Sequence, residues 1–247
     1  MAKGERTALI TGSGRNIGRG CANHLARAGF NIIVNGSSDR SACERVADEV
    51  RAIGTDAMVA IADIGNESAV TAMANDAIKT FGCVDVVINN AAIRPTSTFL
   101  DMSNDELMRV MNVDCFSAVW LARACLPAMI DNGWGRIINF TGMNAQLGTP
   151  GKVHVSMAKH AGWGLIKSLA REFGPQGITA NIISPGTFPG EGENKAHAGK
   201  LDKLLANTPA RRLGKADDIA ALITLLCSDN GGFINGQMLQ VNGGVVG

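Results

Sequence analysis

The turn from Thr11 to Gly18 carries the residues with the clearest chemical capacity in the chain. It follows a short apolar run and precedes a helical pattern of apolar residues at spacings of three and four, namely Ile17, Cys21, Leu25 and Ala28. Such a turn sets backbone N–H groups at a helix N-terminus against a pyrophosphate. Gly12 and Gly14 allow positive φ and close backbone approach, and Gly18 lets the helix pack on the strand. The turn predicts a dinucleotide site, although plain turn chemistry uses the same glycines.

The segment after the next apolar run indicates which dinucleotide would bind. An NAD site usually places an acid at this strand end to hold the ribose hydroxyls, but here Asn35-Gly36 stands there. Four groups could surround a 2′-phosphate instead: Arg15, Ser37, Ser38 and Arg40. This arrangement favours NADP over NAD, with ordinary capping and surface groups as the alternative.

Two further strand ends carry polar groups. Asp63 could accept a hydrogen bond from an adenine amino group or cap the helix that follows. Asn89 and Asn90 precede two alanines, so their amides could brace neighbouring strand ends beside a flat ligand or form a simple turn.

Seven apolar runs alternate with helical patterns along the chain. The strands and helices that they predict would position the polar groups described above. The expected strands span residues 7–10, 31–35, 56–61, 84–89, 136–140, 179–183 and 237–241, and the expected helices lie near 17–28, 41–53, 67–80, 104–131, 153–173 and 216–227. Because the runs are apolar at consecutive positions, they are typical of parallel strands covered on both faces. The pattern predicts one α/β domain over residues 1–247, a doubly wound parallel seven-stranded sheet with ligands beyond the carboxyl ends of the strands.

The composition bounds the function classes. A chain of 247 residues with 46% apolar residues can bury one large core, and a net charge of +1 gives no reason to expect a nucleic acid or membrane partner. No uninterrupted apolar run approaches the length of a membrane span. Six cysteines share no metal-ligand spacing, so we expect no metal site but reduced core thiols in a cytoplasmic protein: Cys21, Cys43, Cys83, Cys115, Cys125 and Cys227.

With these motifs in order, the chain resembles the short-chain dehydrogenase/reductase family over nearly its whole length. The family's turn Thr-Gly-x-x-x-Gly-x-Gly matches residues 11–18, except that Asn16 replaces the middle glycine, and Asn tolerates a left-handed conformation. Residues 89–92, 183–186 and 242–244 match its Asn-Asn-Ala-Gly, Pro-Gly and C-terminal motifs, with Ala92 for glycine. The resemblance implies a Rossmann-like fold with these cofactor contacts: Gly12, Gly14, Arg15, Asn16, Ile17, Gly18, Ser37, Asp63, Ile64, Asn90, Lys159 and Phe188.

The resemblance also implies a catalytic group of Asn, Ser, Tyr and Lys. In the family, Tyr exchanges the proton as hydride moves to or from the nicotinamide, Lys lowers the Tyr pKa and binds ribose, Ser positions the carbonyl, and Asn holds a relay water. Asn112 and Lys159 match, whereas Val155 stands at the Tyr position and Gly142 at the Ser position. Helical spacing puts Val155 one turn before Lys159 on the same stripe, and loss of a positioned general acid typically costs about 10²–10⁴ in rate.

Nearby groups could replace the missing proton donor. His154 is the first candidate, because imidazole as a group can exchange protons near neutrality. In a helix its side chain points about 100° from that of Val155, so a surface histidine at the helix entry is the alternative. Ser156 could contact Lys159, but its hydroxyl is a poor acid. Lys159 itself could act as a base if burial lowers its pKa, and the alternative is that it only binds ribose. Three hypotheses stay open: an NADP-preferring oxidoreductase acting on a small carbonyl or alcohol, with His154 or a water on Asn112 and Lys159 as donor; an isomerase, lyase or hydrolase; and a cofactor-binding protein without catalysis.

Residues around the expected cleft indicate what kind of substrate would bind and whether the chain forms an oligomer. The polar segment of about residues 188–213 predicts a mobile lid. Its cations and Arg94 favour a small anionic substrate, although a solvated loop accounts for the same charges. The helices near 104–131 and 153–173 are too apolar for the surface of a monomer, and the resemblance implies a homotetramer or dimer.

Overall fold

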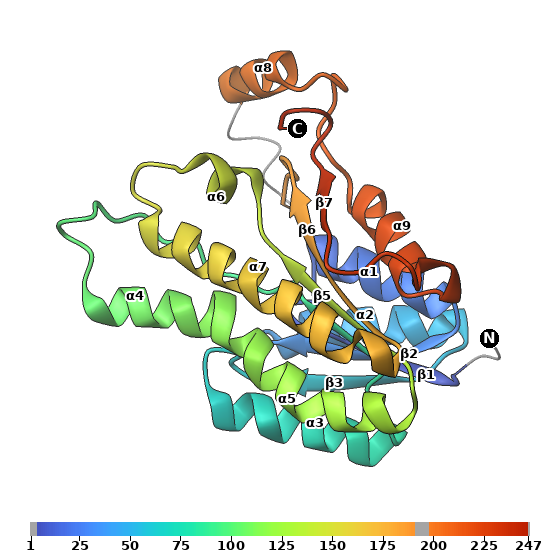
Figure 1. Ribbon diagram of the computed structural model, residues 1–247. Coiled ribbons are helices and arrows are strands. Elements are labelled where there is room, and N and C mark those ends of the chain that lie inside the picture. Colours follow the sequence, from blue (N-terminus) through green and yellow to red (C-terminus); the bar gives the residue numbers. More distant parts are fainter. Residues whose placement is uncertain (1–3, 191–197, 247) are drawn as a thin grey trace.

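Seven parallel strands form one sheet in the order β3-β2-β1-β4-β5-β6-β7 (Figure 1), in a computed structural model that describes residues 4–190 and 198–246. The strands are Arg6–Ile10 (β1), Phe30–Gly36 (β2), Ala57–Ile61 (β3), Val86–Asn89 (β4), Gly135–Phe140 (β5), Ile178–Pro185 (β6) and Met238–Val241 (β7). The sequence therefore predicted every strand to within two residues at each end. The reversal of strand order beside β1 and β4 places the ends of these two strands at a topological switch point, where ligands bind in such sheets.

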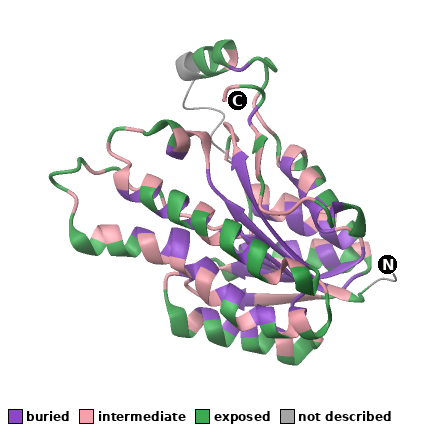
Figure 2. Ribbon diagram, in the orientation of Figure 1, coloured by how far each residue is buried: buried purple, intermediate pink, exposed green. Residues whose placement is uncertain are grey.

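Helices cover both faces of the sheet. They are Asn16–Arg27 (α1), Arg40–Ile53 (α2), Glu67–Phe81 (α3), Asn104–Met111 (α4), Ser117–Asp131 (α5), Met143–Leu147 (α6), Val153–Phe173 (α7), Ala198–Asn207 (α8) and Ala216–Leu226 (α9). A π-helical turn, η1 (Asn112–Phe116), joins α4 to α5, and 3₁₀ turns follow α7 (Gly174–Gln176) and α9 (Asp229–Gly231). One core cluster packs α1, α2 and α9 against the sheet, and a second packs α3, α5 and α7 against the opposite face. Figure 2 shows the buried residues concentrated in the strands between these layers.

Polar side chains fix where several helices begin. Asp39 accepts a hydrogen bond from Ala42 N at 2.9 Å, Asn66 caps α3, and Ser103 caps α4. The helix α1 differs, because within the described residues its N-cap Arg15 makes no side-chain capping bond and its first turn holds no acid. A helix start with no side-chain cap and no acid in its first turn suits an anion.

The continuous helical stretch Asn104–Asp131 lies inside the fold. Its length and its mean hydropathy of 1.5 would be enough to cross a membrane. The sequence did not indicate this, because polar residues interrupt its apolar runs. However, 56% of that apolar window is buried, and the stretch packs against α3 and α7. This is the burial expected of a core helix. On the outer side, Met108 of α4 and Met157 of α7 are exposed, and the homotetramer or dimer stays a prediction.

All six cysteines lie in the described part of the chain, where they are buried and form no disulfide. The prediction of core thiols is therefore confirmed. Burial raises the pKa of Cys125 and of Cys227 to about 12, which keeps both thiols protonated and unreactive at neutral pH.

Trp134 lies between two guanidinium groups at the amino edge of the sheet. The Cζ atoms of Arg6 and Arg136 lie 3.6 and 4.1 Å from the centre of its ring. Arg136 is 3% exposed, and its guanidinium donates hydrogen bonds to backbone carbonyls of four residues: Gly135, Gly177, Leu226 and Ser228. This side chain therefore ties β5 to the end of α9.

Arg136→Met is expected to lower the free energy of unfolding by about 3 kcal/mol or more, because several buried carbonyls lose a charged donor. Arg6→Met is the matched control on the other face of the same indole. Arg6 pairs with an Asp229 side chain that is 78% exposed, so we expect a loss of about 1 kcal/mol or less. Urea unfolding followed by circular dichroism measures both, and equal losses would contradict the assignment.

Candidate functional site

The glycine-rich turn adopts the predicted left-handed conformation at Gly12 but not at Gly14, which is not among the described glycines with positive φ. Asn16 has φ of 50° and Gly12 has φ of 61°, so the substitution of Asn for glycine preserves the left-handed position. A Cβ atom at Gly18 would lie 2.5 Å from Gly12 O and 2.8 Å from Asn90 Nδ2, so the close helix–strand contact requires glycine there. Asn90 Nδ2 donates to Thr11 O at 2.9 Å and Gly12 O at 3.1 Å. The amide of Asn90 therefore braces the turn, as the sequence predicted for this motif.

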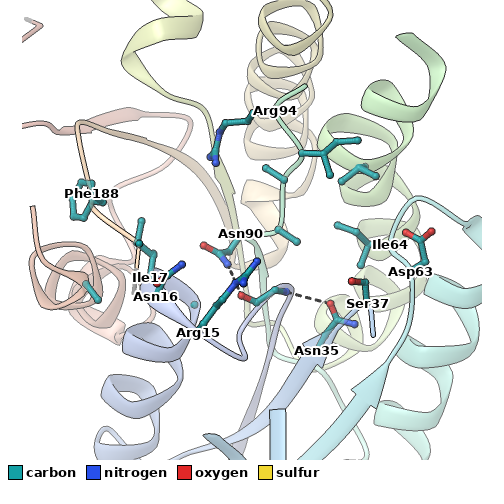
Figure 3. A pocket seen from close by; sticks show the side chains of 18 of the residues that line it. Arg15, Asn16, Ile17, Asn35, Ser37, Asp63, Ile64, Asn90, Arg94 and Phe188 are labelled. Carbon is teal, nitrogen blue, oxygen red and sulfur yellow. Dashed lines mark hydrogen bonds between the residues drawn. The ribbon is translucent and has the colours of Figure 1, made fainter. Parts of the chain in front are cut away.

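A cavity of about 630 Å³ runs along this turn and across the carboxyl ends of β1, β2, β3 and β4. Figure 3 shows Arg15, Ser37, Asp63, Asn90 and Phe188 around it. Ten of the twelve predicted cofactor contacts line it, all but Gly14 and Lys159: Gly12, Arg15, Asn16, Ile17, Gly18, Ser37, Asp63, Ile64, Asn90 and Phe188. The uncapped N-terminus of α1 forms part of its floor. An extended groove with an open helix N-terminus at its centre fits a dinucleotide, with the pyrophosphate at α1.

Gly14 lies beneath the turn rather than in the groove. A Cβ atom there would lie 3.2 Å from Cys43 Sγ and 3.4 Å from Ala42 Cβ. Gly14 therefore permits the turn to pack closely on α2, and the structure gives it no contact with the groove itself.

The ribose end of the groove has no carboxylate at the end of β2. Asn35 is 1% exposed, accepts a hydrogen bond from Gly12 N, and donates to Ala60 O and Ala62 O, so its side chain is structural. Arg15 and Ser37 line the groove. The structure does not bring in the other two predicted phosphate ligands: Ser38 is absent from the groove lining, and Arg40 pairs with Glu44 on α2.

The end of the groove at Asp63, where the sequence predicts adenine, contains an ion pair that was not predicted. The Asp63 carboxylate accepts from Gly65 N at 2.9 Å and from two nitrogens of Arg109, each at 3.0 Å. Burial raises the pKa of Asp63, but these hydrogen bonds outweigh it and hold the pKa below its ordinary value. Arg109 comes from α4 and lines the groove. The sequence contains no signal for this pair, because Arg109 follows Asp105 and Glu106 by one helical turn and could equally pair within its own helix.

A second cavity of about 340 Å³ adjoins the groove and shares Ile17, Arg94 and Phe188 with it. Its other lining residues come from the ends of β5 and β6 and from the start of α7: Thr141, Gly142, Met143, Asn144, Ala145, Thr149, Lys152, Val155, Ser156, Lys159, Pro185, Gly186 and Thr187. Among the described residues, its charged lining groups are all cations. Lys152 holds the adjoining loop, because its Nζ donates to Arg94 O, Pro95 O and Thr96 Oγ1.

Val155 and Gly142, where the resemblance implies a Tyr and a Ser, both line this second cavity. Val155 packs with Val110, Cys115 and Ala158 in a small apolar cluster between α4, η1 and α7. Gly142 has φ of 175°, an extended conformation, and no described atom lies within 4 Å of where its Cβ would be. Neither residue places an ionisable side chain in the cavity.

Lys159 reaches the same cavity from α7 but is itself 4% exposed. Its Nζ lies 3.1 Å from Oδ2 of Asp114, whose side chain is fully buried. Burial lowers the pKa of Lys159, and the Asp114 carboxylate opposes that shift. Asp114 was not predicted from the sequence, where it appears as an isolated acid in an apolar helix.

His154 is not the surface histidine that the sequence favoured. It is 0% exposed, and its Nε2 lies 3.2 Å from Oε1 of Glu106 on α4. Within the described structure neither ring nitrogen makes a hydrogen bond. Because α7 has begun at Val153, the imidazole points toward α4, and His154 is absent from the lining of the cavity. The geometry gives no support to a catalytic role for His154.

The structure places Asn112 outside both cavities and only part of the predicted lid beside them. Asn112 opens the π-helical turn, a feature often found at functional sites, but lines neither cavity. Of the segment 188–213, Phe188 lines both cavities, α8 is a helix that the sequence did not predict, and residues 191–197 lie outside the described part of the chain.

Comparison with known proteins agrees with this geometry. The family described as enoyl-(acyl carrier protein) reductase matches residues 12–246. The 3-oxoacyl-[acyl-carrier-protein] reductase FabG of Staphylococcus epidermidis is 32% identical over 240 residues, covering 97% of this chain and 98% of the relative. A structure provisionally described as a gluconate dehydrogenase from Agrobacterium tumefaciens has a TM-score of 0.90 at 30% identity, covering 99% of this chain and 97% of its own. One provisionally described as a short-chain alcohol dehydrogenase from Sinorhizobium meliloti 1021 has a TM-score of 0.92 at 26% identity, covering 99% and 97%.

Proposed function

Because the chain belongs to the short-chain dehydrogenase/reductase family, whose relatives here are oxidoreductases, we propose that it is an NADP-preferring oxidoreductase with an altered proton donor. Its substrate would be a small anionic carbonyl compound or the corresponding alcohol. The observation that carries the proposal is Lys159, which reaches the cavity beside the groove while Val155 and Gly142 leave it without the usual acid. Relatives named as reductases of 3-oxoacyl groups and as dehydrogenases support carbonyl–alcohol chemistry.

NADP would lie in the groove between Arg15 and Ser37 at the ribose phosphate and the N-terminus of α1 at the pyrophosphate. The absence of a carboxylate from the described end of β2 supports a 2′-phosphate over free ribose hydroxyls. When bound, the reduced nicotinamide supplies a hydride to the carbonyl carbon.

The chain's own residues supply the proton. As the carbonyl π electrons move to oxygen, the Lys159 ammonium donates a proton to that oxygen, and the alcohol forms. The neutral amine then regains a proton from water in the cavity. A lysine whose pKa is lowered by burial is a stronger acid than a solvated one, so it transfers its proton more readily at neutral pH.

Arg94 supports an anionic substrate. It lies where groove and cavity meet, and Figure 3 shows its side chain extending over the space between Asn90 and Phe188. We expect Arg94→Gln to raise KM for a reactive keto acid about tenfold or more, with a smaller change in kcat, because the charge contributes binding in ground and transition states alike. The matched control is Arg27→Gln at the far end of α1, which should change neither constant. An unchanged KM in Arg94→Gln would reject an anionic substrate anchored here.

A panel of ketones, aldehydes, keto acids and 3-oxoacyl thioesters, assayed by the absorbance of NADPH, tests the proposed reaction. Turnover of one class above that of a Lys159→Ala control supports it. No turnover of any class, with NADPH still bound, would reject it.

A second function has an observation in its favour. Val155 belongs to an apolar cluster and Lys159 faces a carboxylate, so the cavity is built without the family's proton donor. A protein that binds NADP(H) as a sensor or as a partner of an active relative would have this arrangement. Tight NADPH binding by fluorescence titration, without chemistry on any panel member, would favour it.

A further inference from the structure

A buried carboxylate joins three segments behind the cavity. Asp114 Oδ1 accepts a hydrogen bond from Ile93 N at 2.9 Å, and Oδ2 lies 3.1 Å from Lys159 Nζ. Ile93 directly follows the Asn-Asn-Ala-Ala motif at the end of β4, while Lys159 lies at the centre of the cavity wall. The backbone N–H fixes the carboxylate in place, and the carboxylate in turn fixes the ammonium.

The charges around Lys159 show why this contact matters. Arg94, from the loop after β4, repels the ammonium, whereas the Asp114 carboxylate, from η1, favours it. Cys115 follows Asp114 in η1, and burial raises the pKa of its thiol, which is therefore uncharged at neutral pH. The residues of β5, β6 and the start of α7 that line the cavity with Lys159 include one other charged group, Lys152, whose Nζ is turned to the 94–96 loop. The Glu106–His154 pair lies on the same α4–α7 seam, one helical turn nearer the start of α7. Burial and Arg94 therefore oppose the charged lysine, and Asp114 is the carboxylate that faces it.

We propose that Asp114 is a positioning residue that holds the Lys159 ammonium at the cavity and keeps it protonated for transfer. The transfer step rests on the proposed function, whereas the pairing does not. After Lys159 has given its proton to the substrate oxygen, the Asp114 carboxylate faces a neutral amine. Its negative charge then favours the return of a proton from water to Nζ, which completes the cycle without a tyrosine.

Asp114→Asn tests the inference directly, because an asparagine can still accept the hydrogen bond from Ile93 N but carries no charge. The titration of Lys159 is followed by NMR of the whole protein labelled with ¹³C at lysine Cε, with Lys159→Met identifying the signal. We expect the titration midpoint of Lys159 to fall by about one to three pH units in Asp114→Asn, because an opposite charge at this distance supports the charged form by that amount. The matched control is Asp85→Asn, since Asp85 is also buried and accepts from Thr7 N at 2.8 Å, at the amino edge of the sheet.

An unchanged midpoint in folded Asp114→Asn would overturn the inference, as would an equal fall in Asp85→Asn. The unaltered protein gives a second measurement that does not depend on the variant folding: the Ile93 amide resonance should titrate with the same midpoint as Lys159, and an Ile93 amide insensitive to that titration would overturn the pairing. If the midpoint falls as expected while no panel substrate is reduced, the pair stands and the proposed reaction is rejected. If a substrate is reduced, the loss of reduction on the alkaline side should move to lower pH in Asp114→Asn.

Discussion

The double variant Gly142→Ser/Val155→Tyr is expected to reduce carbonyl substrates about 10²–10⁴-fold faster than the unaltered protein. The two positions already line the cavity, and the resemblance implies a Ser and a Tyr there. At Gly142 the backbone is extended and no described atom lies within 4 Å of the added Cβ, so a serine requires no rearrangement. At residue 155 a phenol would extend into the cavity one helical turn before Lys159, which can then lower its pKa.

The control for this gain uses the same substitutions elsewhere on α7. Gly164 also has open space at its Cβ, and Met157 is exposed on the outer side of the helix, so Gly164→Ser/Met157→Tyr changes composition equally without reaching the cavity. Initial rates of NADPH oxidation with the carbonyl panel compare the two variants. If Gly142→Ser/Val155→Tyr binds NADPH and is no faster than the control, the cavity does not hold nicotinamide and carbonyl in the family's geometry.

Lys159→Met is expected to lower the rate of reduction at least 10²-fold, because it removes the proposed proton donor and leaves an alkyl chain of similar length. The pH profile of the unaltered protein should show which protonation state of Lys159 each reaction direction uses. Reduction uses the ammonium form, so its rate should fall as pH rises through the pKa of Lys159, which burial places below the ordinary 10.5. Oxidation uses the neutral amine and should rise over the same interval.

Lys167→Met is the control, since Lys167 lies on the same helix with its ammonium over the Trp163 ring at 5.1 Å. Steady-state rates from pH 6 to 10 measure both variants. If Lys159→Met changes the reduction rate by less than a factor of about three, another group donates the proton. The pH profile of Lys159→Met would then report the pKa of that other group.

The fold could be predicted from the sequence because its signals are local. Apolar runs and 3.6-residue periodicity located all seven strands, and α7 was predicted with its observed ends, Val153 and Phe173. Two helices escaped prediction. The helix α6 has only five residues, whereas α8 has leucines at helical spacing, Leu201, Leu204 and Leu205, that were overlooked within a segment interpreted as a polar lid. The left-handed Asn16 was likewise predictable, because its conformation depends on the residue's own backbone preference.

The ion pairs of the site could not be predicted in the same way. Asp63 and Arg109 are 46 residues apart, and Asp114 meets Lys159 across two different helices. Such pairings depend on how α4, η1 and α7 pack, which periodicity does not report. His154 shows the same limit: its direction relative to Val155 and the helix that contains α4 were both predicted, but the packing of α4 over His154 was not.

The π-helical turn between α4 and α5 sets the direction of the side chains on α4. A π turn holds one more residue than an α-helical turn, so every side chain before it is rotated by about 100° relative to a regular helix continued back from α5. Arg109 therefore owes its direction toward Asp63 to an insertion several residues downstream. Loss of one residue there would keep the packing of α5 but rotate Arg109 away from Asp63, so this ion pair depends on the extra residue in the π-helical turn.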